Sequence, residues 1–322
     1  MAAARAVLTG LLVLLVTGCT ALSGSSSEPS ASQGALEKPK IRVSMMSTID
    51  TAPFWLAKDG GYFRREGLDV STTEAATGQA SLTKLLSGEA DIAYSSYTPF
   101  FVARSKGTAD IRLIADASSA GPRSTGVVAL PSSGIRSVAD LAGKRIGISA
   151  PNTIADTLTK SVLADNHVDA SGIKWVPLPL PNTAAALKNG DIDAGFLTEP
   201  FITQASRTAG AELVADTGTG STVDFPTAGY GTLGSFTSSS PKTAAAFQRA
   251  MAAATRDASA DRKRIEPLMV KYAKIDADTA ARTGLLTLQS TVDARRLQRV
   301  PDLLLKTGVL AKPVDVSAMV VR

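Results

Sequence analysis

Two stretches of the sequence about a hundred residues apart carry the same pattern, and this repeat constrains the fold more than any other feature. Residues 88–100 begin Gly-Glu-Ala-Asp and end in Pro-Phe, and residues 190–201 begin Gly-Asp-Ile-Asp and also end in Pro-Phe. The two glycines are 102 residues apart (190 − 88), and upstream Arg42 aligns with Arg145 at an offset of 103. Repeats in the same order at this spacing indicate two duplicated lobes, because the units of a solenoid are far shorter.

Each copy predicts strand, helix, strand, helix and strand in turn. The expected elements are strands 41–46, 68–72 and 91–94 with helices 55–66 and 79–87, then strands 145–149, 174–178 and 194–197 with helices 153–166 and 183–189. Alternating strands and helices favour mostly parallel sheets flanked by helices on both faces. The sequence therefore predicts an α/β protein with two such lobes.

The connections predict a hinge between the lobes. A fourth strand is expected at 111–116, followed by a crossing into residues 126–130, a return through 216–224 into a strand at 230–236, and a helix that begins at Ser240-Pro241. The first lobe would then comprise residues 41–123 and 228–322, and the second lobe residues 124–227. Two crossings leave a cleft, and the carboxyl ends of parallel strands would line it.

The amino-terminal residues predict export and lipid attachment. Arg5 precedes an apolar run at residues 6–16, and Val16-Thr-Gly-Cys19 follows. One positive charge, a short apolar core and small residues indicate a signal peptide over residues 1–18, and the run is too short to span a bilayer. The Val-Thr-Gly-Cys ending resembles the bacterial lipobox, which implies lipidation of Cys19; an ordinary signal peptide is the alternative. Residues 19–40, rich in Ser, Gly and Pro, would form a flexible tether.

Composition argues against several classes of function. The net charge is +5, but basic residues are scattered or stand beside acids, which argues against nucleic-acid binding. His167 and Cys19 are the only histidine and cysteine. This excludes a Cys/His metal site and a Cys/His nucleophile pair once Cys19 is lipidated, and makes a Ser/His/acid triad improbable. We therefore expect no enzyme activity, no metal and no cofactor.

The loops that follow the predicted strands provide the candidate ligand-binding residues. Asp50 and Glu199 are acids that would suit an amine and repel a bare sulfonate or nitrate, although Glu199 could instead point outward or bond to the backbone. The hydroxyl-rich loop at 47–51 could bind a ligand or merely cap a helix, and both readings stay open. Arg123 could pair with an anion, and Phe201 and Phe225 could wall the cleft or belong to the core. The full candidate set is Ser47, Thr48, Asp50, Thr51, Gly78, Ser95, Ser96, Tyr97, Ser118, Asn152, Thr153, Glu199 and Tyr230.

Several motifs resemble one family of transport proteins. They lie at residues 52–57, 61–70, 88–92 and 137–147, at Glu199-Pro200 and in the tail from residue 297. The chain is similar to the periplasmic solute-binding proteins of ABC importers, in the branch that binds aliphatic sulfonates, taurine, nitrate or thiamine-precursor pyrimidines. The resemblance implies the type II periplasmic-binding-protein fold and closure of two lobes around a small solute.

The resemblance also implies a cellular setting. The protein would be a monomer, held by its lipid on the extracytoplasmic face of the cell membrane, and would deliver solute to an ABC permease. The solute stays open between an alkyl sulfonate-like anion and a pyrimidine-like amine. The alternatives to a solute-binding role are an enzyme of the same fold that acts on a small carboxylic acid, and a ligand sensor. A related family that builds the thiamine pyrimidine uses a cysteine-rich motif, and that motif is absent here.

Overall fold

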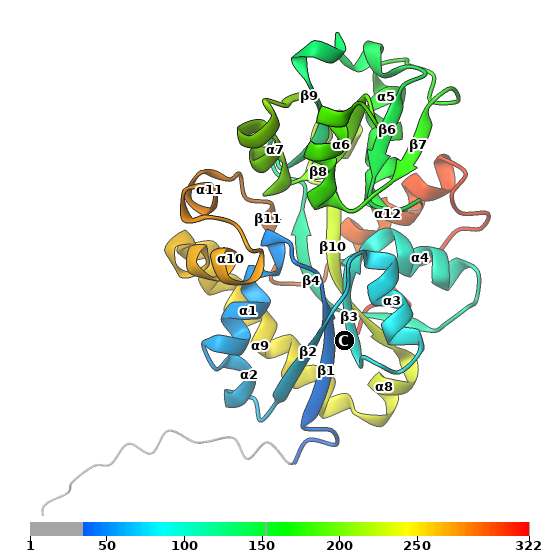
Figure 1. The fold of residues 1–322 in the computed structure, drawn as a ribbon. Coiled ribbons are helices and arrows are strands. Elements are labelled where there is room, and N and C mark those ends of the chain that lie inside the picture. The colour runs from blue at the N-terminus through cyan, green and yellow to red at the C-terminus, as the bar shows by residue number, and fades with distance from the viewer. Residues whose placement is uncertain (1–34, 152, 322) are drawn as a thin grey trace, which may run out of the picture. The chain divides into compact units, whose positions relative to one another are not determined.

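A computed structural model describes residues 35–151 and 153–321. The predictions for the signal peptide, for Cys19, for Asn152 and for most of the tether lie outside these residues. The described chain forms two β-sheets with helices around each of them (Figure 1). Sheet A has the strand order β11-β4-β10-β3-β1-β2, and sheet B has the order β7-β6-β8-β5-β9. Two α/β lobes are therefore present, as the repeat predicts.

The strands of sheet A are β1 (Lys40–Met45), β2 (Asp69–Glu74), β3 (Ile92–Ser96), β4 (Ile111–Ser119), β10 (Pro226–Leu233) and β11 (Thr287–Leu288). Those of sheet B are β5 (Thr125–Ala129), β6 (Arg145–Ile148), β7 (Lys174–Pro177), β8 (Ala194–Thr198) and β9 (Glu212–Asp216). The helices are α1 (Ala52–Asp59), α2 (Tyr62–Arg65), α3 (Gly78–Leu86), α4 (Tyr97–Ser105), α5 (Ile154–Asp165), α6 (Thr183–Asn189), α7 (Phe201–Ala209), α8 (Gly234–Ser239), α9 (Pro241–Ala260), α10 (Glu266–Tyr272), α11 (Ala277–Arg282) and α12 (Ala294–Lys306).

The repeat has a direct structural counterpart. In sheet A, β1 pairs in parallel with β2 and β3, and in sheet B, β6 pairs in parallel with β7 and β8. The backbone N–H of Arg42 donates to Asp91 at 2.8 Å, and that of Arg145 donates to Asp193 at 2.8 Å. The repeated aspartates therefore fasten the first strand of each copy to the third.

Both sheets are mixed rather than mostly parallel. Strand β10 runs antiparallel to β3 and β4, and β5 runs antiparallel to β8 and β9. The cause is the connection between sheets: the chain leaves sheet A after β4, enters sheet B at β5, and returns from β9 into β10. A strand that comes back from the opposite sheet enters in the reverse direction.

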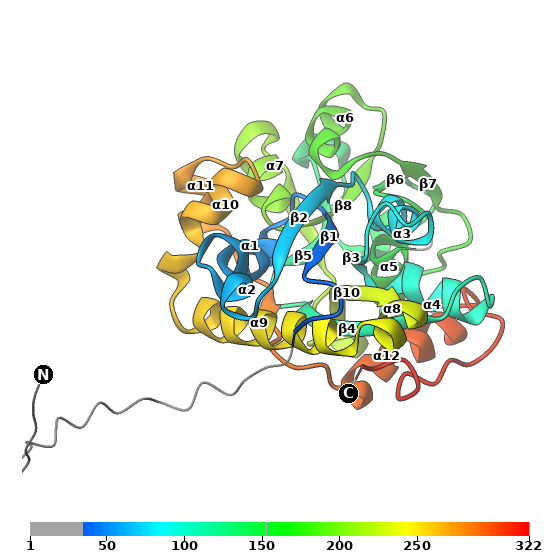
Figure 2. The same cartoon turned by 90° about the horizontal axis from the view of Figure 1, so that it is seen from below.

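Helices cover both faces of each sheet. Helices α1, α2 and α9 pack on one face of sheet A, and α9 runs beneath this sheet in Figure 2. Helices α4 and α12 pack on its other face. In sheet B, α5 covers one face and α6 and α7 cover the other. This double cover explains why the strands are rich in apolar residues on both sides.

Most predicted elements match the structure to within one to three residues, and two differ more. The helix expected at 55–66 is two helices, because Gly60 and Gly61 interrupt it and Gly61 has a left-handed φ of 76°. The strand expected at 230–236 begins earlier, at Pro226, and ends at Leu233. Gly234 then starts α8, and its N–H donates to the carbonyl of Asp110 at 2.7 Å.

A separate search for membrane-crossing helices gives a negative result. Within residues 35–151 and 153–321, no helix combines the length and the apolar character needed to cross a bilayer.

The close approach of β10 to α4 generates a stability prediction. A Cβ at Gly229 would lie 2.3 Å from the buried hydroxyl oxygen of Tyr97. We expect Gly229→Ala to lower the free energy of unfolding by about 2 kcal/mol, because overpacking forces strain on the core. Gly172→Ala is the matched control, since its nearest neighbour would lie at 3.5 Å. Urea unfolding measures both, and equal losses in the two variants would contradict this packing.

Candidate functional site

A small cavity of about 60 Å³ lies between the two sheets. Its walls include residues at the carboxyl ends of strands from both copies, namely Met46, Ser96, Ser149 and Thr198. This is the location that the strand-end rule predicts for a ligand. The other lining residues are Thr48, Asp50, Gly78, Tyr94, Thr153, Ile154, Leu180, Phe196, Thr227, Ala228 and Leu286. We call this space the inter-sheet cavity.

Asp50 provides the charge of the inter-sheet cavity. It is only 6% exposed, and the hydroxyl of Ser118 donates to its carboxylate at 2.7 Å. Ser118 also shares a hydrogen bond with Thr227 at 2.6 Å. Among the ion pairs of the described chain, none involves Asp50, and no lysine or arginine lines the cavity. A nearly buried carboxylate therefore faces a space that no cation among the described residues neutralises.

Two tyrosines surround this carboxylate. Burial raises the pKa of Tyr94 well above its usual value, and the Asp50 carboxylate beside it raises that pKa further. The pKa of Tyr230 is raised by the same two causes. Both phenols therefore stay protonated at neutral pH. Tyr94 lines the cavity and accepts a hydrogen bond from Thr48 at 3.2 Å.

Helix α3 begins at the cavity wall. The hydroxyl of Thr77 caps it by accepting from the N–H of Ala80 at 3.1 Å, which leaves the amides of Gly78 and Gln79 without a partner inside the helix. The Ser95 hydroxyl lies beside Gly78 and is buried with no hydrogen-bond partner in the described structure. Helix amides and a free hydroxyl make this wall suited to an acceptor group.

The second copy contributes the start of helix α5. Thr153 and Asp156 form the predicted capping box: the N–H of Thr153 donates to Asp156 at 3.0 Å. The Thr153 hydroxyl donates to the Ala150 carbonyl at 2.8 Å, and Thr153 also lines the cavity. Thr153 therefore both caps helix α5 and forms part of the cavity wall.

The structure brings only part of the candidate set to this cavity. Thr48, Asp50, Gly78, Ser96 and Thr153 line it. Thr51, Ser95 and Ser118 are buried next to lining residues, and Ser47 lines a neighbouring hollow together with Phe201. Tyr97 and Tyr230 belong to the core: Tyr97 donates to Asp116 at 2.7 Å, and Tyr230 packs on Phe54 and Tyr94. Their rings are not in the cavity wall.

The remaining candidates lie elsewhere. Glu199 is buried, but it accepts two bonds from Thr203, at 3.0 Å from the N–H and 2.8 Å from the hydroxyl, and it is absent from the cavity wall. Arg123 is exposed, and its backbone N–H donates to Asp216 at 2.9 Å. Phe225 is in the core beneath Arg299. Thus Asp50 is the acid of this cavity, and Glu199 stabilises the start of α7.

The repeat contained a signal for lining residues that are not in the candidate set, among them Met46, Ser149 and Thr198. Ser96 lies 102 residues before Thr198, and Met46 lies 103 residues before Ser149, the offsets of the two copies. Tyr94 and Phe196 are also 102 residues apart, so the repeat relates them as well. Thr227 and Leu286 had no such signal as cavity residues. Leu286 in particular comes from a segment outside both copies.

With this geometry in place, comparison with known proteins identifies the family. The profile of the family described as NMT1/THI5 like matches residues 48–265. The chain belongs to the NMT1/THI5-like family. A relative from Bacillus subtilis (strain 168), named "Putative aliphatic sulfonates-binding protein", is 24% identical over 230 residues, which are 69% of this chain. The match spans 65% of that relative's length.

Solved structures share the fold across most of both chains. The alkanesulfonate-binding protein SsuA of Xanthomonas axonopodis pv. citri, bound to MOPS, superposes with a TM-score of 0.75 at 20% identity, covering 89% of this chain and 99% of SsuA. The periplasmic nitrate-binding protein NrtA of Synechocystis PCC 6803 gives 0.75 at 15% identity, covering 88% and 86%. A Candida albicans protein described as having the generic periplasmic binding protein fold gives 0.71 at 16%, covering 88% and 96%. The fold expected from the resemblance is therefore present.

A search for metal-binding side chains gives no candidate. Among residues 35–151 and 153–321, no group of three or more His, Cys, Asp or Glu side chains is placed to hold a metal ion.

The contact between Gly78 and Ser95 can be tested with a double-mutant cycle. A Cβ at Gly78 would lie 2.4 Å from the Ser95 hydroxyl oxygen. We expect Gly78→Ala to cost about 1–3 kcal/mol of stability. Adding Ser95→Ala should recover most of that loss, because the clashing atom is removed. Urea unfolding of the two single variants and the double variant measures the coupling, and additive losses would show that the two residues are not in contact.

Proposed function

We propose that this protein is the solute-binding component of an ABC importer, and that its inter-sheet cavity captures a small polar organic compound. The carrying observation is the Asp50 carboxylate, nearly buried in a cavity that both sheets enclose. An uncompensated buried charge is costly, so a group that donates hydrogen bonds or carries positive charge gains strongly by binding there. The family and the fold support the role of a binding protein.

The polarity of the cavity narrows the solute. Asp50 lies on one wall, and Gly78 at the start of α3 lies on another, with the Ser95 hydroxyl buried beside it. We infer a solute that presents an amino group to Asp50 and an acceptor group to α3. A bare nitrate or alkyl sulfonate would meet the carboxylate without an opposing cation. An amino-bearing sulfonate and an aminopyrimidine both satisfy the two walls.

The mechanism follows from the connections between the sheets. The chain crosses between them twice, after β4 and before β10, so bending at these crossings would open and close the cavity. A solute that contacts both sheets binds the closed arrangement best and shifts the population toward it. The closed form would then dock on a membrane permease and release the solute unchanged, without catalysis.

Asp50 supplies the decisive test. Taurine and isethionate form a matched pair, because both carry a sulfonate on two carbons and only taurine carries an ammonium. We expect taurine to bind at least about ten-fold more tightly, since a charge-assisted hydrogen bond contributes about 1.5–3 kcal/mol. For the same reason, 4-aminopyrimidine should bind more tightly than pyrimidine. Isothermal titration calorimetry measures each dissociation constant.

The control variants separate the two loop acids. Asp50→Asn should abolish the preference for the amine, whereas Glu199→Gln should leave it unchanged, because the Glu199 carboxylate is bonded to Thr203. If Asp50→Asn retained the preference, or if nitrate and isethionate bound more tightly than every amine, the proposed solute class would be wrong.

We further propose that the mature chain begins at a lipid-modified Cys19, and that residues 19–40 tether a monomeric binding protein to the extracytoplasmic face of the membrane. Two or more acyl chains give stable anchoring, and a tether raises the local concentration of the receptor at its permease. The apolar run at residues 6–16 and the Val-Thr-Gly-Cys sequence support this.

Cys19→Ala tests the anchor. In a bacterial host that processes lipoproteins, the wild-type protein should incorporate labelled palmitate and enter the detergent phase of a Triton X-114 extraction. The variant should lose both properties while its unfolding midpoint stays unchanged. Palmitate incorporation into the variant would refute attachment at this residue.

A further inference from the structure

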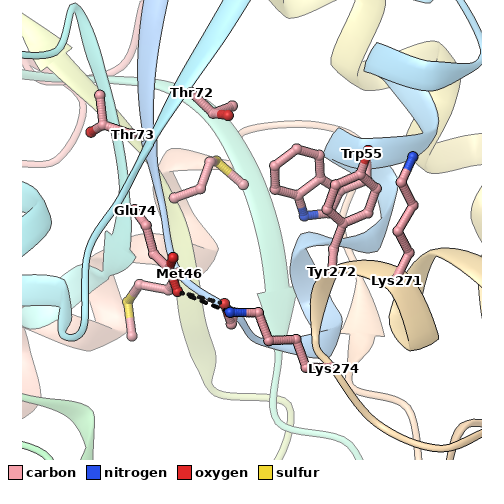
Figure 3. A pocket seen from close by; sticks show the side chains of 10 residues that line it. Met46, Trp55, Thr72, Thr73, Glu74, Lys271, Tyr272 and Lys274 are labelled. Carbon is pink, nitrogen blue, oxygen red and sulfur yellow. Dashed lines mark hydrogen bonds and ion pairs between the residues drawn. The ribbon is translucent and has the colours of Figure 1, made fainter.

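A second and larger hollow, of about 300 Å³, lies beside strand β2 at the edge of sheet A. The ends of β1 and β2, helix α1 and the end of α10 form its walls (Figure 3). It shares Met46 with the inter-sheet cavity, but Asp50 is not part of its wall. Its volume lies at the lower end of the range for small-molecule sites. We call it the edge pocket.

A pair of stacked rings forms one wall of the edge pocket. The rings of Trp55 and Tyr272 lie 3.7 Å apart between centroids, with only 4° between their planes. The Lys271 ammonium lies 4.7 Å from the Tyr272 ring centroid and also donates to Asp59 at 3.0 Å. Tyr272 therefore holds the indole in a fixed orientation, and a flat, polarisable surface results.

The remaining walls combine thioethers and an exposed ion pair. Met45 and Met46 supply adaptable apolar surface, and sulfur contacts aromatic rings favourably. Glu74 and Lys274 face each other across the pocket at 3.9 Å, with side chains 70% and 73% exposed (Figure 3). Such a long, exposed pair contributes little energy, so the Lys274 ammonium can exchange Glu74 for another carboxylate.

The charges around the ring pair favour an anion over a cation. The ammonium of Lys58 lies 5.8 Å from the Trp55 ring centroid. With Lys271 and Lys274 this gives three ammonium groups against the carboxylates of Asp59 and Glu74, a local net charge of +1 (3 − 2). A further ammonium group brought by a ligand would be repelled.

Two polar atoms in the wall have unused hydrogen-bonding capacity. The indole N–H of Trp55 and the hydroxyl of Thr73 are buried and have no hydrogen-bond partner among the described residues. A buried donor without an acceptor is destabilising. The wall covers both atoms, so a ligand oxygen reaches the indole N–H only if a neighbouring side chain shifts.

We propose that the edge pocket is a second small-molecule site, which takes a planar aromatic carboxylate. The ring of the ligand stacks on Trp55 between the two methionines, and its carboxylate pairs with Lys274. This site is separate from the inter-sheet cavity and does not depend on the proposed transport function. The two sites have opposite charge preferences, set by Lys274 in one and Asp50 in the other.

The two tryptophans allow a direct test. Trp55 and Trp175 are the only tryptophans of the sequence, so an NMR spectrum of the ¹⁵N-labelled protein shows two indole N–H signals, assigned with Trp175→Phe. Trp175 is the internal control, because it has Lys160 5.5 Å from its ring centroid but lies on β7 of sheet B. Benzoate should move the Trp55 signal saturably, with a dissociation constant of about 1 mM, and leave Trp175 in place.

Matched ligands and variants make the test specific. Cyclohexanecarboxylate keeps the charge without the flat ring, and benzylammonium keeps the ring with the opposite charge; each should bind at least about five-fold more weakly. Lys274→Gln should weaken benzoate several-fold and remove its advantage over benzylammonium. Asp50→Asn should leave benzoate binding unchanged, which separates this site from the inter-sheet cavity.

Three outcomes would overturn the proposal. The first is a Trp55 signal that stays in place up to roughly 50 mM benzoate, about fifty times the expected dissociation constant. The second is an equal movement of both tryptophan signals. The third is binding of cyclohexanecarboxylate or benzylammonium that matches benzoate.

Discussion

The carboxylate of Asp50 lies just beyond β1 and accepts a hydrogen bond from Ser118 of β4, which in turn is bonded to Thr227 of β10. These are the two strands through which the chain leaves sheet A and returns to it. Two hydrogen bonds in series therefore join the carboxylate of Asp50 to the two strands that lead into the crossings, which would act as the hinge. Burying a carboxylate without a cation costs several kcal/mol, and hydroxyl donors offset only part of this cost. A bound amine would offset the remaining cost of burying the carboxylate. Because Asp50 is bonded to the strands at the crossings, solute binding would be linked to the arrangement of the sheets.

The duplication explains both the symmetry of the site and its polarity. Equivalent strand ends from the two copies meet at the inter-sheet cavity, as Ser96 and Thr198 do. At the offset of 103 residues that relates Met46 to Ser149, Asp50 corresponds to Thr153. The first copy thus places an acid where the second places a helix cap, and the cavity is charged on one side only.

Much of the fold could be predicted because the repeat shows the order of strands and helices along the chain in both copies. Helix α6 spans the predicted residues 183–189, and the capping box at Thr153 starts α5 as expected. The break in the helix at Gly60 and Gly61 was missed, because periodicity alone does not show which glycine ends a helix.

For the cavity, the sequence predicts which loops lie near it but not which of their side chains point into it. Tyr97 follows β3, yet it starts α4 and its ring lies in the core. The Glu199 carboxylate accepts a hydrogen bond from Thr203, four residues later in the sequence. The face that a side chain occupies depends on packing from β10 and α7, which no local pattern shows. The edge pocket is a stronger case, since Trp55 and Tyr272 meet only through tertiary structure.

The central claim is that Asp50 and the start of α3 hold one solute between the two sheets. A crystal structure of the protein with its most tightly bound amine tests this most directly. The account predicts that the amino nitrogen lies within hydrogen-bonding distance of the Asp50 carboxylate, and that an acceptor group of the solute contacts the amides of Gly78 and Gln79. A solute bound outside the inter-sheet cavity, or one whose anionic group is turned toward Asp50, would contradict it.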